Sequence, residues 1–233
     1  MLARACSTLC LLVVACGDPG DAPIDATGAD ADASLGADAP APTAAEVLWA
    51  ALSTCDVIGG PYAADSGGPA TIDVCALPTA VAWVADLDID CDGQPSAACN
   101  ATTDPSYLPE TAATDSHGDP LDAAALPYVV LPAPSARFDY RDHGLGMRSV
   151  VAVVYADRVE YGVAGDVGPA AIIGEASYAL AANLGVDPDP ATGGTDGPVG
   201  YVAFTGAAAK VTTIEDHAEA VALGQALVDD LRP

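Results

Sequence analysis

The apolar run Ser149-Val-Val-Ala-Val-Val-Tyr155 decides the fold of this chain, because it is followed at once by a second run. A continuous apolar run of this length is typical of a strand that is buried on both faces. The next residues, Ala156-Asp-Arg158, predict a tight hairpin connection, and a second strand returns over Val159-Glu-Tyr-Gly-Val-Ala164, closed by Gly165-Asp166. The two runs therefore predict a β-hairpin within the central sheet.

Further elements are predicted on both sides of this hairpin. The long stretch from Ser53 to Val74 is rich in glycine and proline and is expected to be irregular. The chain has no repeating β-α-β rhythm, so we expect an α+β fold with a central, mainly antiparallel, barrel-like sheet and a few helices. The predicted strands cover 80–87, 128–131 and 199–205, and the predicted helices cover 44–52, 174–184 (ended by Gly185) and 213–231 (capped by Thr213).

The first part of the chain predicts export and a tether. Residues 1–16 have the pattern of a signal peptide, and the ending Val13-Val-Ala-Cys16 resembles the lipobox of bacterial lipoproteins. That resemblance implies lipidation of Cys16, and the alternative is an ordinary signal peptide with a chance cysteine. Residues 17–44 are rich in Asp, Ala and Pro and are expected to be a disordered tether. The predicted domain covers residues 45–233.

The charge of the chain limits its partners. The formal net charge is −26 at pH 7, with 33 acidic residues against seven Lys and Arg. Such a surface repels nucleic acids and anionic lipid head groups, and it attracts metal ions, polyamines and cationic polymers. Solubility alone also explains an acidic surface. We expect a monomer with no nucleic-acid partner, which touches a membrane only through a lipid anchor.

Four cysteines remain after the predicted leader and lipobox: Cys55, Cys75, Cys91 and Cys99. An even number in an exported domain favours two disulfides, which can be connected in three ways. Sequence proximity favours the pairs Cys55–Cys75 and Cys91–Cys99. A zinc site is disfavoured, because there is no Cys-x-x-Cys pair among them and the histidines, His117, His143 and His217, lie elsewhere.

Two carboxylates, Asp166 and Glu175, lie in an apolar and turn-rich stretch without a nearby base. Asp166 is expected to end a strand and Glu175 to begin a helix, across a Gly-Pro turn. Two carboxyl groups over one cleft can cleave a glycosidic bond, one as proton donor and the other as base or nucleophile. The alternative is structural: Glu175 as an acid favoured by the helix dipole, and Asp166 as a turn former.

The region from Trp83 to Phe204 resembles the glycoside hydrolase family 75 chitosanases. The resemblance covers more than half of the chain, and its motifs follow in the order of the family. The motifs are Asp86-Leu-Asp-Ile-Asp-Cys-Asp-Gly-Gln94, Cys99-Asn-Ala-Thr-Thr-Asp-Pro105, Leu126-Pro-Tyr-Val-Val-Leu-Pro132, Ser149-Val-Val-Ala-Val-Val-Tyr155, Tyr161-Gly-Val-Ala-Gly-Asp-Val-Gly-Pro169 and Ile172-Ile-Gly-Glu-Ala-Ser-Tyr178.

The resemblance implies endo-hydrolysis of β-1,4-linked glucosamine polymers with inversion at the anomeric carbon, and it assigns the essential carboxylates to Asp166 and Glu175. We expect Glu175 to be the general acid and Asp166 the base that activates water. A helix N-terminus at Glu175 opposes this assignment, because it stabilises the anion, whereas apolar neighbours and repulsion from Asp166 favour the proton. No cofactor is expected.

Three alternating acids, Asp88, Asp90 and Asp92, are expected to face one side of an extended segment and to bind the ammonium or hydroxyl groups of glucosamine. The alternatives are solvated acids or a calcium loop, but the twelfth residue counted from Asp88 is Cys99 where an EF-hand needs glutamate. We therefore expect no metal. Tyr161 is a further candidate for sugar binding, although core packing would explain it equally.

A non-enzymatic function is the main alternative, in which a surface lipoprotein binds a cationic polysaccharide or calcium without cleaving it.

Ser177 does not lie in a Gly-x-Ser-x-Gly elbow, so a serine hydrolase is disfavoured.

Overall fold

The computed structural model describes residues 41–232. The predicted signal peptide with Cys16, and nearly all of the predicted tether, lie outside the described residues. Within the described part of the chain, no helix is both long enough and apolar enough to cross a membrane.

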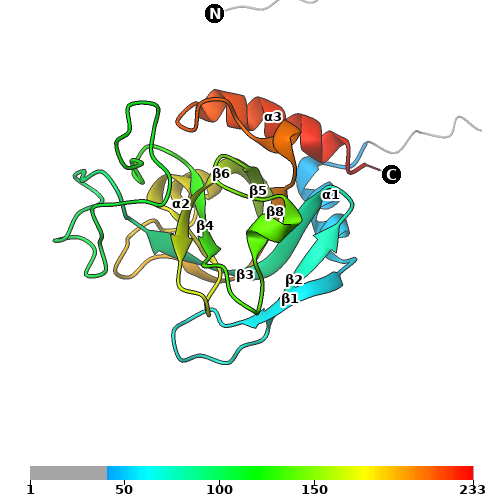
Figure 1. Ribbon diagram of the computed structural model, residues 1–233, viewed down its shortest axis with the longest axis horizontal. Helices are drawn as coiled ribbons and strands as arrows, with labels where there is room; N and C mark the ends of the chain where they lie inside the picture. The colour runs from blue at the N-terminus through cyan, green and yellow to red at the C-terminus, as the bar shows by residue number, and fades with distance from the viewer. Residues whose placement is uncertain (1–40, 233) are drawn as a thin grey trace, which may run out of the picture. The chain divides into compact units, whose positions relative to one another are not determined.

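Six strands form a closed barrel, as expected for the predicted α+β fold (Figure 1). Going around the barrel, the order is β3, β7, β4, β6, β5, β8 and back to β3, with β3–β7 and β4–β6 parallel and the other neighbours antiparallel. Their bounds are β3 Ala80–Asp90, β4 Tyr128–Pro132, β5 Val150–Tyr155, β6 Arg158–Gly168, β7 Glu175–Ser177 and β8 Thr195–Phe204.

The alternation of β3 separates the inside of the barrel from its outside. Val81, Trp83, Ala85 and Leu87 are buried in one apolar cluster with residues of every other barrel strand, so they fill the interior. The next residues along the strand point the other way. Ala80 and Ala82 belong to the second cluster, which lies under the helices, and the outer face of β3 then continues as Asp86, Asp88 and Asp90. The barrel therefore presents a row of acids on its outer surface.

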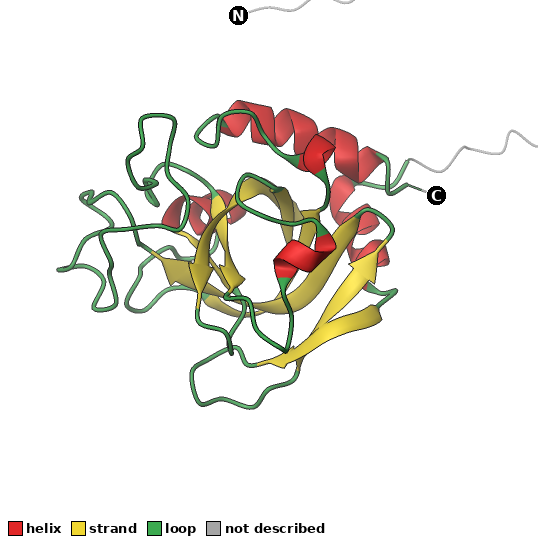
Figure 2. Cartoon of the chain, in the orientation of Figure 1, coloured by secondary structure: helices red, strands yellow, loops and turns green. Residues whose placement is uncertain are grey.

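Three α-helices accompany the barrel within the described residues (Figure 2). Helix α1 (Ala44–Leu52) begins as predicted, with a capping box at Thr43, and it contacts α3 (His217–Asp229), which packs on β5 and β6. Helix α2 (Tyr178–Leu184) ends at Gly185, as predicted, with a φ of 78°. Two short 3₁₀ helices, η1 (Tyr140–His143) and η2 (Ala207–Ala209), lie in the connections.

The segment predicted to be irregular forms a hairpin, so that prediction is wrong. Strands β1 (Asp56–Tyr62) and β2 (Ile72–Leu77) pair with each other, and β2 extends the sheet beyond β3. Register shifts on both sides of Gly59 interrupt the alternation of apolar and polar side chains. Because a strand is recognised in a sequence by that alternation, β1 could not be predicted from it. Both predicted disulfides are present, Cys55–Cys75 at this hairpin and Cys91–Cys99 after β3.

Three boundaries also differ from the prediction. Glu175 begins the short strand β7 and not a helix, and α2 starts only at Tyr178 after the cap residue Ser177. Asp166 lies inside β6, which continues to Gly168. The last helix is capped by Asp216, whose side chain accepts the Glu219 N–H, and not by Thr213.

Candidate active site

A row of neighbouring strand positions brings the two predicted catalytic carboxylates to one face of the barrel. Asp88 on β3 is paired with Glu175 on β7. Because Val129 is paired with Ala176, Val130 lies beside Glu175 on the next strand. Val130 is in turn paired with Asp166 on β6. The row thus runs Asp88, Glu175, Val130, Asp166 across four strands on the outer surface.

A β-bulge turns Asp166 toward this face. The register passes from Val129 opposite Ala164 to Val130 opposite Asp166, so Gly165 is an extra residue in β6. A side chain at Gly165 would not fit, because its Cβ would lie 2.7 Å from the Cβ of Tyr128. Without the bulge, Asp166 would lie on the same face of β6 as Ala164, and its side chain would point into the apolar interior of the barrel.

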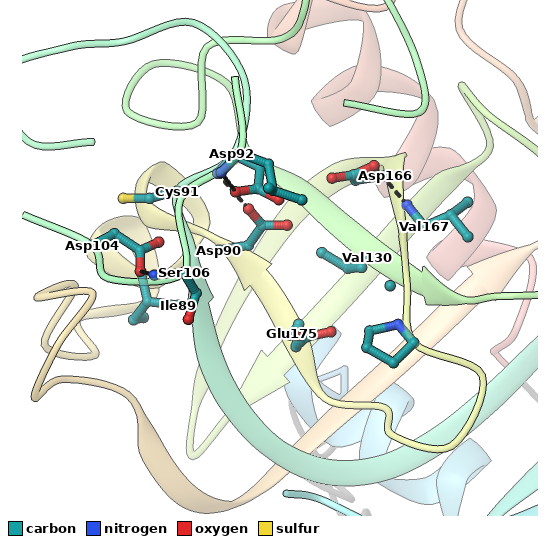
Figure 3. Close-up of a pocket in the computed structure, with 13 residues that line it drawn as sticks. Ile89, Asp90, Cys91, Asp92, Asp104, Ser106, Val130, Asp166, Val167 and Glu175 are labelled. Atoms are coloured by element: carbon teal, nitrogen blue, oxygen red, sulfur yellow. Dashed lines mark hydrogen bonds between the residues drawn. The ribbon is translucent and has the colours of Figure 1, made fainter. Parts of the chain in front are cut away.

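The two carboxylates line a cavity of about 410 Å³ together with other acids (Figure 3). Val130 lies between Asp166 and Glu175 in this view, so the two carboxyl groups face the cavity from opposite sides of one apolar residue. The lining residues that carry acidic side chains are Asp90, Asp92, Asp104, Asp166 and Glu175.

The wall opposite the sheet is a long loop that is tied to these carboxylates. Asp166 accepts the Ala112 N–H at 2.6 Å, and Asp92 accepts the Leu108 N–H at 2.6 Å. Asp104, which is buried, accepts the Ser106 N–H at 2.7 Å. The acids therefore position the loop that covers them, and the loop N–H groups hold the acids in place.

Glu175 is suited to hold a proton. Burial, and after it the negative charges of Asp88, Asp166, Asp92 and Asp86, together raise its pKa to about 7. Its carboxyl group lies against the backbone of Gly168, where a Cβ would be 2.7 Å from the Glu175 Oε2 atom. Since Glu175 begins a strand, the helix N-terminus that would have stabilised its anion is absent.

Asp166 has a different environment. Burial raises the pKa of its carboxyl group overall, and the N–H groups of Ala112 and Val167 (2.8 Å), which donate to the same Oδ1 atom, offset part of that rise. Hydrogen bonds to a carboxylate favour its charged form. The pair thus consists of one carboxyl group without a hydrogen-bond donor among the described contacts and one with two donors.

The acids at the end of β3 are also perturbed. Burial raises the pKa of Asp90 to about 8 and that of Asp92 to about 6, and it raises the pKa of Asp88. Asp90 keeps part of its surface open to the cavity, although protein atoms surround its carboxyl group densely. Asp88 does not line the cavity, but it is the strand neighbour of Glu175.

Asp90, Asp92 and Asp166 each offer a carboxylate oxygen, and these oxygens lie within 4.8 Å of one another. The trio is the group of described residues best placed to bind a cation. Each carboxylate already accepts a backbone N–H, which orients it without an ion, and acidic groups of this kind are common without one, so we assign no metal. Asp88 and Asp90 are strand residues, which does not support the calcium-loop alternative.

Tyr161 is not among the residues that line the cavity. It is buried on β6, and its ring lies against Gly224 of α3, where a Cβ would be 2.3 Å from the ring. Conversely, the sequence reading missed Asp104, Ser106 and Tyr128, which lie at or next to the cavity. Tyr128 and Asp104 lie in two motifs of the family resemblance, 126–132 and 99–105, but neither motif indicates which of its residues lies at the cavity, and Ser106 gave no signal.

Comparison with known proteins identifies the family of this chain. The sequence model of the family described as fungal chitosanase of glycosyl hydrolase group 75 matches residues 87–226. An endo-chitosanase of Aspergillus oryzae is 37% identical over 133 residues, which cover 52% of this chain and 54% of the relative. Endo-chitosanase B of the same organism is 36% identical over 129 residues, with the same coverage, and an Aspergillus fumigatus endo-chitosanase is 38% identical over 102 residues (41% and 43%).

The chain spans about half the length of the curated relatives it matches. The family match itself covers more than half of this chain and includes the end of β3, both candidate carboxylates and the whole cavity lining. This chain therefore belongs to the glycosyl hydrolase group 75 chitosanase family.

Proposed function

We propose that this protein hydrolyses β-1,4 glycosidic bonds within chitosan, with Glu175 as the general acid and Asp166 as the general base. The observation that carries the proposal is the contrast between the two carboxyl groups in one cavity. Glu175 has a pKa of about 7 and holds its proton near neutral pH, whereas two N–H groups favour the anion of Asp166. One group can donate a proton to the leaving oxygen, and the other can accept one from water.

The spacing of the strands supports inversion at the anomeric carbon. Glu175 and Asp166 lie on β7 and β6, with β4 between them. Two strand spacings of about 4.8 Å place the two backbones about 10 Å apart. Inverting enzymes need roughly 6.5–9.5 Å between the carboxyl groups, which leaves room for water, whereas retaining enzymes need about 5 Å. The spacing of the two backbones is closer to the range of inverting enzymes. Proton NMR of the first products would give the anomer: release of the α-anomer is expected, and release of the β-anomer would contradict inversion.

Electrostatics support a cationic substrate. The cavity is lined by acids, and among the described residues none of the four ion pairs involves a lining acid. We propose that Asp92, which lines the cavity, and Asp88, the strand neighbour of Glu175, contact glucosamine ammonium groups. Such contacts weaken in salt, so the KM for chitosan should rise severalfold between low and high ionic strength.

The decisive experiment compares the release of reducing ends from chitosan by the wild type, Glu175→Gln and Asp166→Asn. Each variant is expected to lose about 10²–10⁴ in kcat, since acid and base steps each contribute about that much. Full activity in both variants would refute the proposal. Chitosans of graded acetylation, together with chitin, would define the substrate range.

The alternative function is a binding protein for cationic polysaccharide. The acidic cavity by itself would serve either function, but a binder has no use for one carboxyl group that keeps its proton. A binder would be retained on immobilised chitosan without any release of reducing ends, and Glu175→Gln would bind at least as well as the wild type.

We further propose that the protein is exported and tethered through Cys16. Two disulfides in the domain suit an oxidising compartment. Radiolabelled palmitate should be incorporated into the wild type but not into Cys16→Ser, when both are expressed in a bacterium that processes lipoproteins. Equal labelling, or none in either, would refute the tether and leave the proposed hydrolysis unaffected.

A further inference from the structure

Tyr128 lies at the centre of the acids, although it does not line the cavity itself. It begins β4, between the strands that carry Asp166 and Glu175, and its ring is completely buried. Its backbone N–H donates to the Ser177 Oγ atom at 2.9 Å, and the missing side chain of Gly165 leaves room for its ring. The tyrosine is therefore held rigidly from both sides.

The hydroxyl group of Tyr128 has two partners. It lies 3.2 Å from the Asp90 Oδ1 atom and 3.0 Å from the backbone oxygen of Asp92. A backbone oxygen can only accept, so when the tyrosine donates to Asp92, its own oxygen is free to accept a proton from Asp90. The Asp90 Oδ1 atom also accepts the Asp92 N–H at 2.6 Å, which favours the anion, so the hydroxyl satisfies a protonated Asp90 only in the order Asp90 O–H to Tyr128 O–H to Asp92 C=O.

The neighbouring charges make a protonated Asp90 useful. Asp90, Asp92 and Asp166 have oxygens within 4.8 Å of one another, and like charges at this separation disfavour full ionisation. The titratable groups that face Asp90 are Asp92 after β3, Tyr128 on β4, Asp166 on β6 and Glu175 on β7. None of them is a cation, so a proton within the trio is the simplest way to relieve the repulsion.

We propose that Tyr128 is a positioning residue that keeps a proton on Asp90, so that the neighbouring Asp166 remains ionised as the base. This inference rests on the proposed function. The raised pKa of Asp90, about 8, agrees with it, and so do the two N–H donors that favour the anion of Asp166. Tyr128 touches neither the water nor the sugar and acts only through Asp90. The inference also gives Asp90 a different role from Asp88 and Asp92, because a neutral Asp90 cannot act as a counter-ion for an ammonium group of the substrate.

The test is Tyr128→Phe, which removes one hydroxyl group and keeps the ring. Without the hydroxyl group as acceptor, Asp90 loses its proton more readily. The ionised Asp90 then repels the anion of Asp166, and Asp166 therefore keeps its own proton up to a higher pH. The acidic limb of the kcat–pH profile should move up by about one unit, as expected from the loss of one hydrogen bond to an ionisable group, with KM changed less than about twofold. Tyr155→Phe, at the far end of β5, is the matched control and should leave the limb in place.

A second background shows whether Tyr128 acts through Asp90. Asparagine at position 90 is neutral at every pH, so Asp90→Asn should keep the acidic limb of the wild type, and adding Tyr128→Phe to it should not move the limb further. An unmoved limb in Tyr128→Phe, or an equal shift in the Asp90→Asn background, would overturn the inference.

A readout without substrate separates this inference from the proposed function. Carbon-13 NMR of labelled aspartate side chains in the intact protein follows the titration of Asp90 and Asp166 directly. Tyr128→Phe should lower the apparent pKa of Asp90 and raise that of Asp166, whether or not the wild type cleaves chitosan. Identical titration curves in the two proteins would refute the role of Tyr128 even if chitosan hydrolysis is established.

Discussion

At the residue scale, the absence of a side chain at Gly168 matters as much as the acids do. An added Cβ would lie 2.7 Å from the Glu175 Oε2 atom and 3.0 Å from the Val130 Cγ1 atom. The carboxyl group is the flexible end of its side chain, so Gly168→Ala should move it out of place without unfolding the barrel. A displacement of about 1 Å at a catalytic group costs on the order of 100-fold in rate, and we expect that loss in kcat with a nearly unchanged Tm.

Gly146→Ala is the matched control for this substitution. The added Cβ at Gly146 would approach only the Lys210 Nζ atom, at 3.1 Å, which can swing away. Its kcat should therefore equal that of the wild type. Wild-type kcat in Gly168→Ala as well would mean that the position of Glu175 tolerates more displacement than the proposed acid role allows.

The pH dependence of the rate follows from the same residue. A general acid works only while it holds its proton, so the rate should fall as pH rises through the pKa of Glu175, about 7. The measured value belongs to the coupled group of acids, because Asp88 and Asp166 raise the pKa of Glu175 through their charges. Mutation of the strand neighbour, Asp88→Asn, should move this basic limb to lower pH, and kcat measured from pH 4 to 9 would show it. A limb that stays in place would argue against Glu175 as the acid.

How far the sequence predicts the site differs from residue to residue. Asp166 and Glu175 stand out because acids are rare in apolar stretches, and the alternation of Asp88 and Asp90 is visible in the strand pattern. Asp104 belongs to a motif of the family resemblance, but its place at the cavity cannot be deduced from the sequence, because its burial depends on a loop that folds back over the sheet. Long-range contacts of this kind leave no periodic signal in the chain.

At the element scale, the two disulfides allow a direct comparison. Cys91–Cys99 is buried and fixes the start of the loop that carries Asp92 and Asp104, whereas Cys55–Cys75 ties β1 to β2 away from the cavity. Each bridge stabilises the fold by about 3 kcal/mol through loop entropy. Replacing either pair with serine should therefore lower the free energy of unfolding by a similar amount.

Activity should distinguish the two pairs. At a temperature where both variants are folded, the Cys91→Ser, Cys99→Ser double variant should lose at least tenfold in kcat/KM, and the Cys55→Ser, Cys75→Ser double variant should retain wild-type kcat/KM. Chemical denaturation measures the first effect and chitosan hydrolysis the second. Equal activity in the two variants would show that the loop keeps its place without its bridge.

The boundaries of the short elements were the least predictable from sequence. Strand β7 has only three residues, and it precedes α2 without a break, so the apolar pattern of the two merges into one apparent helix. Gly174, with a φ of 124°, marks the real start of the strand. The difference matters chemically, because it places Glu175 beside Asp88 and away from a helix dipole, which removes the objection to a protonated Glu175.

At the scale of the whole molecule, the site exists because the sheet closes on itself. Strand β3 pairs with β8 along one side, and on its other side it pairs first with β2 and then with β7, so Asp88 and Glu175, which are far apart in the chain, become neighbours. The hairpin of β5 and β6 was readable from two adjacent apolar runs. The parallel pairing of β3 with β7, which brings Asp88 to Glu175, joins segments far apart in the chain and could not be deduced from either segment alone.

The same acids make the stability of the barrel depend on pH. Burial raises the pKa of Asp90 to about 8, of Glu175 to about 7, and of Asp86 and Asp92 to about 6, whereas these groups ionise near pH 4 in an unfolded chain. Between about pH 4 and pH 8 the folded protein therefore binds more protons than the unfolded chain, so the free energy of unfolding falls as pH rises through this window. We expect a Tm at pH 5 that is several degrees higher than at pH 8.

General repulsion within a chain of net charge −26 acts in the same direction, and salt separates the two causes. Added NaCl screens repulsion between exposed charges and should raise the Tm at pH 8, but it acts much less on buried groups. Calorimetry at pH 5 and pH 8, in low and in 1 M NaCl, should therefore leave a Tm difference that salt does not remove. Asp90→Asn should reduce that remaining difference, because asparagine has no proton to lose. If the Tm difference vanishes in 1 M NaCl, the acids around the cavity ionise as freely in the folded protein as in the unfolded chain. That result would contradict a protonated Glu175.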